Sequence, residues 1–256
     1  MSGLLVGLPG HAFAAALLFA RIGTALMLLP GTGETEVPVP VRLAFAVVLT
    51  ALLFPALAPA LPPAPGDVGR LLALVGSEAT VGLWFGFLAR LALFALVMAG
   101  QLVALLLGFA SVLTADAVVG PHGTALSRLF ALAGIALALS AGLHALPLAA
   151  LKASYALIPP GEGFAAADAA EMLRRGVAGS LDLALRLAAP FLLAAVLAQA
   201  ALGLLSRLVP QVQVYFLALP AQLLAGIGLL AALIVLVLAV WRERAAALIA
   251  VFPGTA

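Results

Sequence analysis

The sequence predicts an all-α integral membrane protein that crosses the bilayer several times. Of its 256 residues, 66% are hydrophobic and only 9% are charged, and its mean hydropathy is +1.28. A transmembrane helix needs about 20 largely apolar residues, and Leu71 to Phe109 carries only Glu78 and Arg90 as charges. The apolar runs do not alternate with the period of two that a transmembrane barrel requires. Because backbone polar groups inside lipid must be satisfied internally, we expect helices.

Six apolar runs follow one another along the chain. The third is long enough for two passes, so it predicts either two helices that bend near Arg90 or one long helix that projects beyond the lipid. Six or seven helical segments, with hairpins between them, are therefore expected. The runs are Ala12–Leu29, Val41–Leu57, Leu71–Thr114, Ala125–Ala150, Leu183–Leu205 and Val212–Trp241.

Helix-breaking residues separate most of these runs, and prolines also lie inside them. Asp168 followed by Glu171 predicts a helix start, with the first carboxylate capping the helix and the second reaching back to the cap N–H. Internal prolines predict kinked helices, because they free backbone carbonyls. No fixed-period repeat or second domain is visible, so residues 1–256 are expected to form a single membrane domain. The breakers are Pro30-Gly31, Pro38, Pro40, Leu61–Gly66, Gly120-Pro121 and Ile158–Gly161, and the internal prolines are Pro55, Pro147, Pro190 and Pro220.

Charge and composition argue against several classes of function. The formal net charge is only +2 and the charges are scattered, so no footprint for nucleic acid is present. The chain has no cysteine, and His11, His122 and His144 are far apart and belong to no catalytic or metal-binding motif. We therefore expect no enzyme activity and no cofactor. The first cation, Arg21, lies inside the first apolar run, so we expect this segment to be retained and not cleaved as a signal peptide.

Charges inside apolar runs are the first candidates for function, because each costs about 3 kcal/mol at mid-bilayer. They are Arg21, Glu78, Arg90, Asp182 and Arg186. Asp182 and Arg186 are spaced i,i+4 and predict a local salt bridge at a membrane boundary. Arg90 could extend its long side chain to the interface, and Glu78 with Arg90 could form the midplane site of a secondary transporter.

Glycines at four-residue spacing predict close packing between helices. Gly82 and Gly86 form a GxxxG pattern, and Gly100 and Gly108 continue the series. Small residues let helix backbones approach, although accidental spacing in a Gly- and Ala-rich chain is the plainer explanation. The prediction is a chain that depends on other helices for stability.

Ordered motifs extend over most of the chain. They are Pro38-x-Pro40-x-Arg42, Glu78-x-x-x-Gly82-x-x-x-Gly86, Ala99-Gly100-Gln101-Leu102, Asp116, Leu126-Ser127-x-Leu129-Phe130, Gly142-Leu143-His144, Ser154 with Pro159-x-Gly161, Ala184–Pro190, and Leu204–Val214 with Pro220 and Gly226. In the order and spacing of these motifs, the chain resembles the FliR/SctT family of type III secretion export-gate proteins. The sequence departs from the resemblance at Gly120-Pro121-His122, where such proteins commonly have a polar break.

The resemblance implies a non-enzymatic subunit of the export gate in the bacterial inner membrane, associated with the flagellar basal body. Such a subunit assembles with FliP-like and FliQ-like proteins and other export components into a pore for unfolded export substrates. The resemblance also implies that part of the assembly sits above the membrane, so some apolar segments need not touch lipid. Whether the cargo builds a flagellum or an injectisome stays open.

Two further groups of residues are expected at the pore or at subunit contacts, beside Gly82, Gly86 and Gly100. Gln101 and Asp116 form the first; an amide in an apolar run needs a partner, which a channel, another subunit or a helix of this chain could supply. Arg207, Pro210 and Gln211 form the second, as a tight turn between the last two helices. The alternative for that turn is an anchor that sets membrane orientation, and the alternative function is a permease for a small solute.

Overall fold

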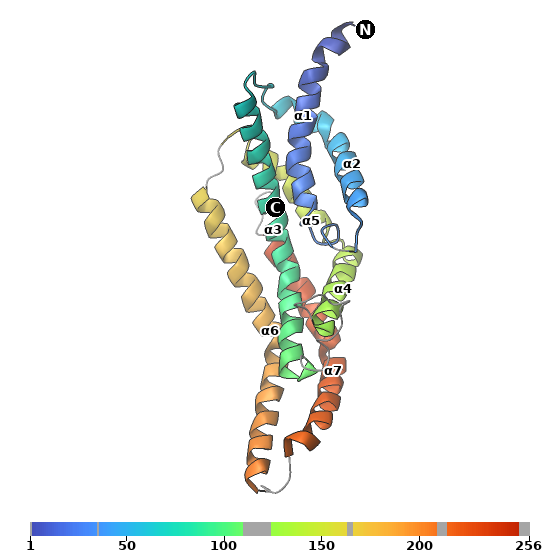
Figure 1. The fold of residues 1–256 in the computed structure, drawn as a ribbon, viewed down its shortest axis with the longest axis vertical. Helices are drawn as coiled ribbons and strands as arrows, with labels where there is room; N and C mark the ends of the chain where they lie inside the picture. The colour runs from blue at the N-terminus through green and yellow to red at the C-terminus, as the bar shows by residue number, and fades with distance from the viewer. Residues whose placement is uncertain (1, 35, 110–123, 163–165, 209–213, 251–256) are drawn as a thin grey trace. The chain divides into compact units, whose positions relative to one another are not determined.

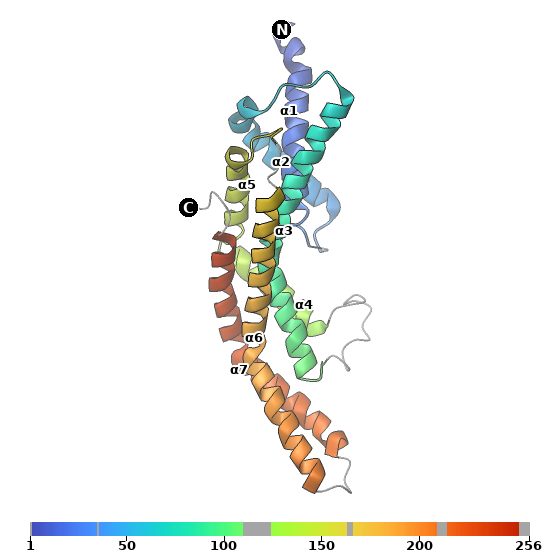
Figure 2. The ribbon, with the colours of Figure 1, turned by 90° about the vertical axis from the view of Figure 1, so that its left-hand side faces the viewer.

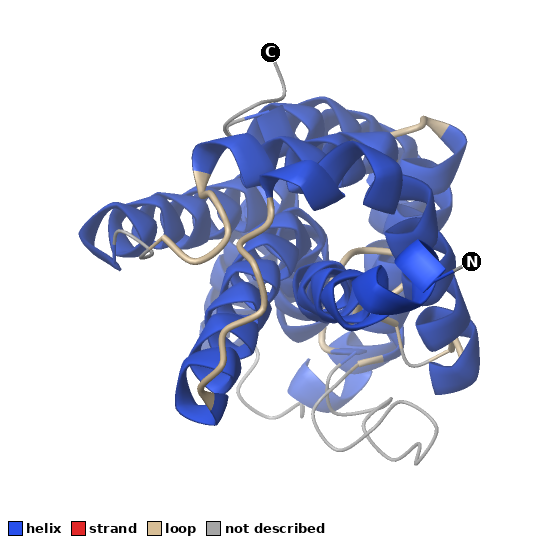
Figure 3. Cartoon of the chain, turned by 90° about the horizontal axis from the view of Figure 1, so that it is seen from above, coloured by secondary structure: helices blue, strands red, loops and turns tan. Residues whose placement is uncertain are grey.

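A computed structural model describes residues 2–34, 36–109, 124–162, 166–208 and 214–250. These residues form seven α-helices and one short 3₁₀ turn (Figure 1). Within these ranges every regular element is a helix (Figure 3). The all-α fold expected from the apolar runs is therefore confirmed.

The first two helices form a hairpin. Helix α1 is Ser2–Leu26 and helix α2 is Val39–Leu57, followed by the 3₁₀ turn η1 at Ala58–Ala60. Pro38 is the N-cap of α2, and a proline also occupies its first turn, where the missing N–H has no helical partner to lose. α2 runs back along α1 in the opposite direction (Figure 1).

The third apolar run forms one helix, α3, Val68–Leu106. Asp67 caps it, since its carboxylate accepts the backbone N–H of Arg70 at 2.9 Å. At 1.5 Å per residue, 39 residues give a helix of about 58 Å, longer than the roughly 30 Å hydrocarbon core. Of the two arrangements that the sequence left open, the single long helix is the one observed.

The fourth apolar run is divided. Helix α4 is Ala125–Ser140 and helix α5 is Ala145–Leu157, and their axes differ by 71°. Gly142 lies between them with a φ of +72°, a conformation that side-chain-bearing residues rarely adopt. Its N–H binds the Leu139 carbonyl, and its own carbonyl accepts the Ala145 N–H. One glycine inside an apolar run therefore turns the chain.

The last two helices are long. Helix α6 is Ala166–Leu208 and helix α7 is Val214–Ala250, with Pro190 and Pro220 inside them. α6 starts near the predicted place, but Asp168 lies within its first turn and is not its cap. Glu171 binds Arg174 and Arg175 at 2.8 Å instead of reaching back to a cap N–H, because these cations are one turn away on the same face.

The backbone divides into two compact units. Unit 1 contains residues 1–91, 139–176 and 247–256, and unit 2 contains residues 92–138 and 177–246. α3 and α6 each contribute to both units. In unit 1, the start of α6 packs beside α3 (Figure 2), where Gly176 faces Leu88 and Leu91 and the Trp84 indole donates to the Ala169 carbonyl at 3.3 Å.

By length and composition, four of the described helices could cross a membrane, or five segments if the bent α4–α5 pair counts as one. The four are α2 with η1, α3, α6 and most of α7. Burial differs between them: 56% of the most apolar α3 window is buried inside the chain, against 11% for α2, 17% for α6 and 11% for α7. The α3 window is thus the most buried of the four, and the others leave apolar surface uncovered by this chain.

Candidate functional site

Among the described residues, the most buried charges form one ion pair in unit 1. The Arg21 guanidinium on α1 is 0% exposed, and Glu78 on α3 is 1% exposed. Arg21 Nε donates to one carboxylate oxygen at 2.7 Å and Nη2 to the other at 2.9 Å. This two-bond geometry is the strongest that arginine and a carboxylate can form. Two charges from separate apolar runs therefore neutralise one another.

The remaining Arg21 donors bind the end of α5. Nη1 lies 3.2 Å from both the carbonyl and the hydroxyl oxygen of Ser154, and Nη2 lies 3.0 Å from the carbonyl of Ile158. The Tyr155 ring covers the guanidinium at 4.3 Å. The Ser154 carbonyl also accepts the Ile158 backbone N–H, whereas the Ile158 carbonyl lies beyond the last residue of the helix, where a cation can satisfy it. Arg21 thereby joins α1, α3 and α5; we call Arg21, Glu78, Ser154 and Tyr155 the Arg21 cluster.

The GxxxG glycines explain how α1 comes close enough for this pairing. Glu78, Gly82 and Gly86 are spaced i, i+4 and i+8, so they share one face of α3. A Cβ on Gly82 would overlap the Arg21 carbonyl and the Thr24 hydroxyl, and one on Gly86 would lie 2.6 Å from the Ala25 carbonyl. Thr24 also donates to the Ala79 carbonyl at 3.1 Å. The structure thus packs Gly82 and Gly86 against α1 of the same chain; their role in subunit contact stays a prediction.

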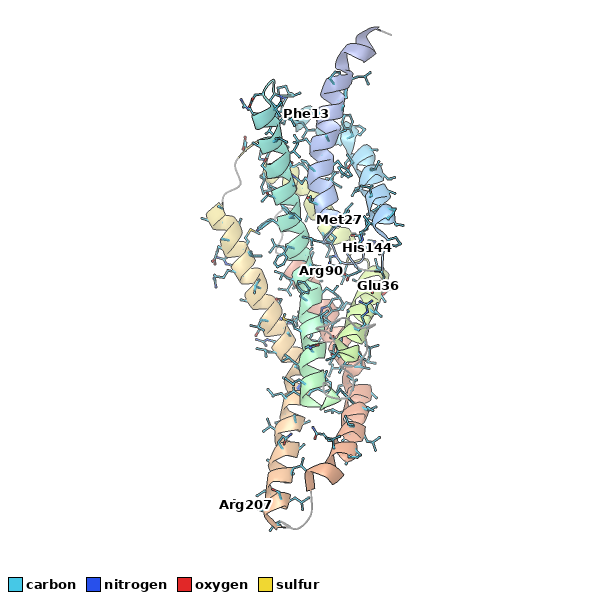
Figure 4. The ribbon with its side chains drawn as sticks, in the orientation of Figure 1. Phe13, Met27, Glu36, Arg90, His144 and Arg207 are labelled. Carbon is cyan, nitrogen blue, oxygen red and sulfur yellow. The ribbon has the colours of Figure 1, made fainter. Side chains whose placement is uncertain are left out.

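Arg90 holds the segment between α1 and α2. Its Nη1 donates to the carbonyls of Leu28 and Gly33, each at 3.2 Å, and its Nη2 lies 3.2 Å from the Glu34 carboxylate. A Cβ on Gly33 would lie 2.6 Å from the Met27 carbonyl oxygen and 2.9 Å from Nη1, so glycine makes room for the backbone and for the guanidinium. Figure 4 labels Arg90 on α3, near Met27 and Glu36 of this segment.

Arg42, from the Pro38-x-Pro40-x-Arg42 motif, fastens the same segment from the α2 side. Its Nε donates to the Val37 carbonyl at 2.9 Å, and its Nη2 donates to the Glu34 carbonyl. Two arginines from different helices therefore hold one connecting segment mainly through its carbonyls.

In unit 2, Gly100 and Gln101 meet the start of α4. A Cβ on Gly100 would lie 2.9 Å from the Ser127 Cα. Thr124 and Ser127 bond reciprocally, each backbone N–H donating to the other's hydroxyl at 3.1 Å, as in a capping box. The Thr124 hydroxyl also donates to the exposed Gln101 side-chain oxygen at 3.2 Å. Gln101 therefore has a hydrogen bond inside this chain, and its predicted place near a pore or subunit boundary stays untested.

Unit 2 also contains a buried tryptophan that sequence reasoning missed. Trp241 on α7 is 2% exposed, and its indole N–H donates to the Ala92 carbonyl of α3 at 2.8 Å. A Cβ on Gly134 of α4 would lie 2.8 Å from Leu96 and 3.6 Å from the Trp241 ring. The available signal was an indole at the end of an apolar run, since a buried tryptophan N–H needs a partner.

The other expected site residues are spread over the chain. Arg207 is exposed in the last turn of α6 (Figure 4), one residue before the helix ends at Leu208. Asp116, Pro210 and Gln211 lie outside the described residues. Asp182 and Arg186 form the predicted salt bridge at 2.6 Å, and both side chains are more than half exposed. In the described ranges, no three His, Asp or Glu side chains are grouped so as to hold a metal ion.

Comparison with known proteins places these features in one family. Residues 12–248 match the family model described as bacterial export proteins, family 1. Three relatives are named flagellar biosynthetic protein FliR. The protein from Caulobacter vibrioides is 30% identical over 94% of this chain and 96% of its own length. The protein from Escherichia coli is 28% identical over 85% and 82%, and that from Bacillus subtilis is 25% identical over 81% and 80%. The chain therefore belongs to the FliR family of bacterial export proteins.

Proposed function

We propose that this chain is a non-enzymatic subunit of the flagellar export gate and helps to form its pore in the bacterial inner membrane. As a member of the FliR family it is a component of an export apparatus. The pore, the FliP-like and FliQ-like partners and the unfolded cargo are the proposed part. The observation that carries the proposal is a family match from residue 12 to residue 248, which includes the Arg21 cluster, α3 and both long C-terminal helices.

The distribution of burial supports a role as one subunit among several. Only 11% to 17% of the most apolar windows of α2, α6 and α7 is buried within the chain. Such surfaces must meet either lipid or other helices, and helices associate in membranes through close packing. A subunit of a larger helical assembly needs surfaces of this kind.

The alternative, a permease for a small solute, required Glu78 and Arg90 to share a site. Glu78 is already bonded through both oxygens to Arg21, and Arg90 is bonded to Glu34 and two carbonyls. A solute would have to displace these partners, and a buried charge that loses its partner is costly. The geometry therefore favours a structural role for both charges.

The test combines purification with an export assay. The tagged chain is co-expressed with the FliP-like and FliQ-like proteins of the same organism, and we expect a stable complex that survives purification. Solute uptake by the purified chain alone in liposomes, with no requirement for these partners, would favour the permease and contradict the proposal.

The segment after α6, which the sequence predicts to be a tight turn, provides a more specific test. Arg207→Ala and Gln211→Ala are expected to lower secretion of flagellar substrates while membrane insertion and partner binding stay normal. Arg242→Ala, which removes an exposed cation from α7, is the matched control and should export normally. If both variants secrete normally, this segment serves only as a membrane anchor and the proposed role in export is wrong.

A further inference from the structure

Helices α1 and α2 are attached to the rest of unit 1 to very different extents. The C-terminal third of α1 is bonded to α3 and α5 through the Arg21 cluster, and Leu17 and Leu26 beside it are fully buried. In α2, only Ala46 and Thr50 are buried. A segment with few buried contacts opens at a low cost in free energy. We therefore asked what holds α2 in place.

The N-terminal end of α2 is held by hydrogen bonds. Arg42, in the first turn, donates to the Val37 and Glu34 carbonyls. Arg90 of α3 binds the same segment through the Gly33 carbonyl and the Glu34 carboxylate. We call Glu34, Arg42 and Arg90 the clamp. It joins the start of α2 to α3 through the segment that precedes α2.

Beyond the clamp, α2 has no hydrogen bond to another element. Its sequence contains two side chains that can form hydrogen bonds, Arg42 and Thr50. The Thr50 hydroxyl donates to the Ala46 carbonyl of the same helix at 2.7 Å, so its proton is used within α2. At the C-terminal end, the Phe54 ring lies near the His11 ring of α1, with 6.2 Å between the centroids. Weak apolar contacts alone therefore hold this end.

The contact between α1 and α2 is also incompletely filled. An open groove of about 650 Å³ runs between the two helices, which lie side by side in Figure 1. Ala12, Ala15 and Ala16 line it from α1, and Ala51 lines it from α2. Small side chains let helix backbones approach one another. The groove thus leaves room for α2 to move closer to α1.

We propose that α2 is a movable arm that pivots at the clamp, so that its C-terminal end swings toward α1 and closes the groove. The structure then shows the open position. Helices in lipid have no hydrophobic driving force toward one another, so the two positions differ little in free energy. Arg42 is a positioning residue, because it braces the arm against the Val37 and Glu34 carbonyls. The inference does not depend on the export function.

The length of α2 sets the size of the motion. Its 19 residues form an arm of about 28 Å at 1.5 Å per residue. A rotation of about 10° at the clamp moves the other end of such an arm by about 5 Å. Residues near the clamp should move much less, so distance measurements at the two ends of α2 test the pivot.

Spin-label distances in the full chain, in lipid nanodiscs, provide this measurement. The chain contains no cysteine, so pairs of introduced cysteines carry the only labels. Exposed Thr80 on α3 is the reference, paired with exposed Val41 at the clamp or with exposed Leu52 toward the other end. The Val41 pair should give a narrow distribution, and the Leu52 pair one broader by about 5 Å. Equally narrow distributions would overturn the proposal.

Removing the brace tests the pivot itself. Arg42→Met keeps a side chain of similar length and should broaden the distribution of the Val41 pair to that of the Leu52 pair. Arg70→Met, which removes an exposed arginine from the first turn of α3, is the control and should leave both pairs unchanged. An unchanged Val41 pair in Arg42→Met would contradict the pivot. If this variant does not fold, the wild-type comparison decides.

Filling the groove tests the direction of the swing. Ala51→Phe places a ring in the groove and should hold α2 in the open position, so the distribution of the Leu52 pair should become as narrow as that of the Val41 pair. Val48→Phe is the control, because Val48 is exposed on α2 and does not line the groove. A distribution that stays broad in Ala51→Phe would show that α2 does not close on α1, and the proposal would be wrong.

Discussion

The two units attach neighbouring helices to α3 by different chemistry. In unit 1, the attachment is the buried ion pair of Arg21 and Glu78, set on a glycine face that admits the α1 backbone. In unit 2, it is mostly apolar, with Gly134 of α4 close to Leu96 and to the Trp241 ring, and one indole hydrogen bond to α3. A single long helix therefore combines a charged attachment with an apolar one.

The difference predicts unequal tolerance to substitution. Removing one member of a buried ion pair leaves a charge without water or partner, which costs about 3–5 kcal/mol. Losing one neutral hydrogen bond in an apolar contact costs about 0.5–1.5 kcal/mol. Substitutions in the attachment of unit 1 should therefore lower the free energy of unfolding more than those in unit 2.

The largest effect is expected for Arg21→Met. The variant keeps an apolar side chain of similar length but leaves the Glu78 carboxylate buried and unpaired, so the free energy of unfolding should fall by about 3–5 kcal/mol. Denaturant titration of the purified chain in mixed micelles measures this loss. The double variant Arg21→Met with Glu78→Leu should recover much of it, since both charges are gone; a double variant as unstable as the single one would contradict the account.

The next largest effect is expected at Gly82, and it tests whether this residue packs within the chain or contacts another subunit. Gly82→Leu should lower the free energy of unfolding by about 3 kcal/mol, because the side chain meets the α1 backbone. Gly76→Leu, two turns earlier in α3 with nothing within 4 Å of its Cβ position, should be neutral or slightly stabilising. If Gly82→Leu instead loses its FliP-like and FliQ-like partners while its free energy of unfolding is unchanged, Gly82 lies at a subunit interface.

A smaller effect is expected in unit 2 from Trp241→Phe. The substitution retains much of the aromatic surface and removes the hydrogen bond to Ala92, so the loss in unfolding free energy should be about 1 kcal/mol. Trp84→Phe, whose bond to Ala169 is longer at 3.3 Å, is the comparison in unit 1 and should cost less. A larger loss for Trp84→Phe than for Trp241→Phe would reverse this order.

The smallest effect is expected for Asp182→Asn. The salt bridge with Arg186 is solvent-exposed in the isolated chain, where such pairs contribute little. Its unfolding curve should overlay that of the wild type, whereas Glu78→Gln should shift the curve clearly. A shift for Asp182→Asn as large as that for Glu78→Gln would show that exposure is a poor guide to the value of these pairs.

The sequence by itself determined the fold class, most of the helices and the family. Long apolar runs admit only helices in lipid, and the spacing of Glu78, Gly82 and Gly86 defines one helix face without any knowledge of its partner. The i,i+4 pair of Asp182 and Arg186 is local and was predicted correctly. The resemblance to the FliR family, read from ordered motifs, is confirmed.

The tertiary structure alone decided which distant residues meet. Arg21 and Glu78 stand out as costly charges, but their sequence separation of 57 residues carries no signal for pairing, and Glu78 could equally have been assigned to Arg90. The break at Gly142 depends on a backbone conformation that an apolar pattern does not encode. Trp241 meets Ala92 across 149 residues of chain. Periodicity reports only which face of a helix is apolar, whereas the packing of whole helices selects the partner of each buried polar group.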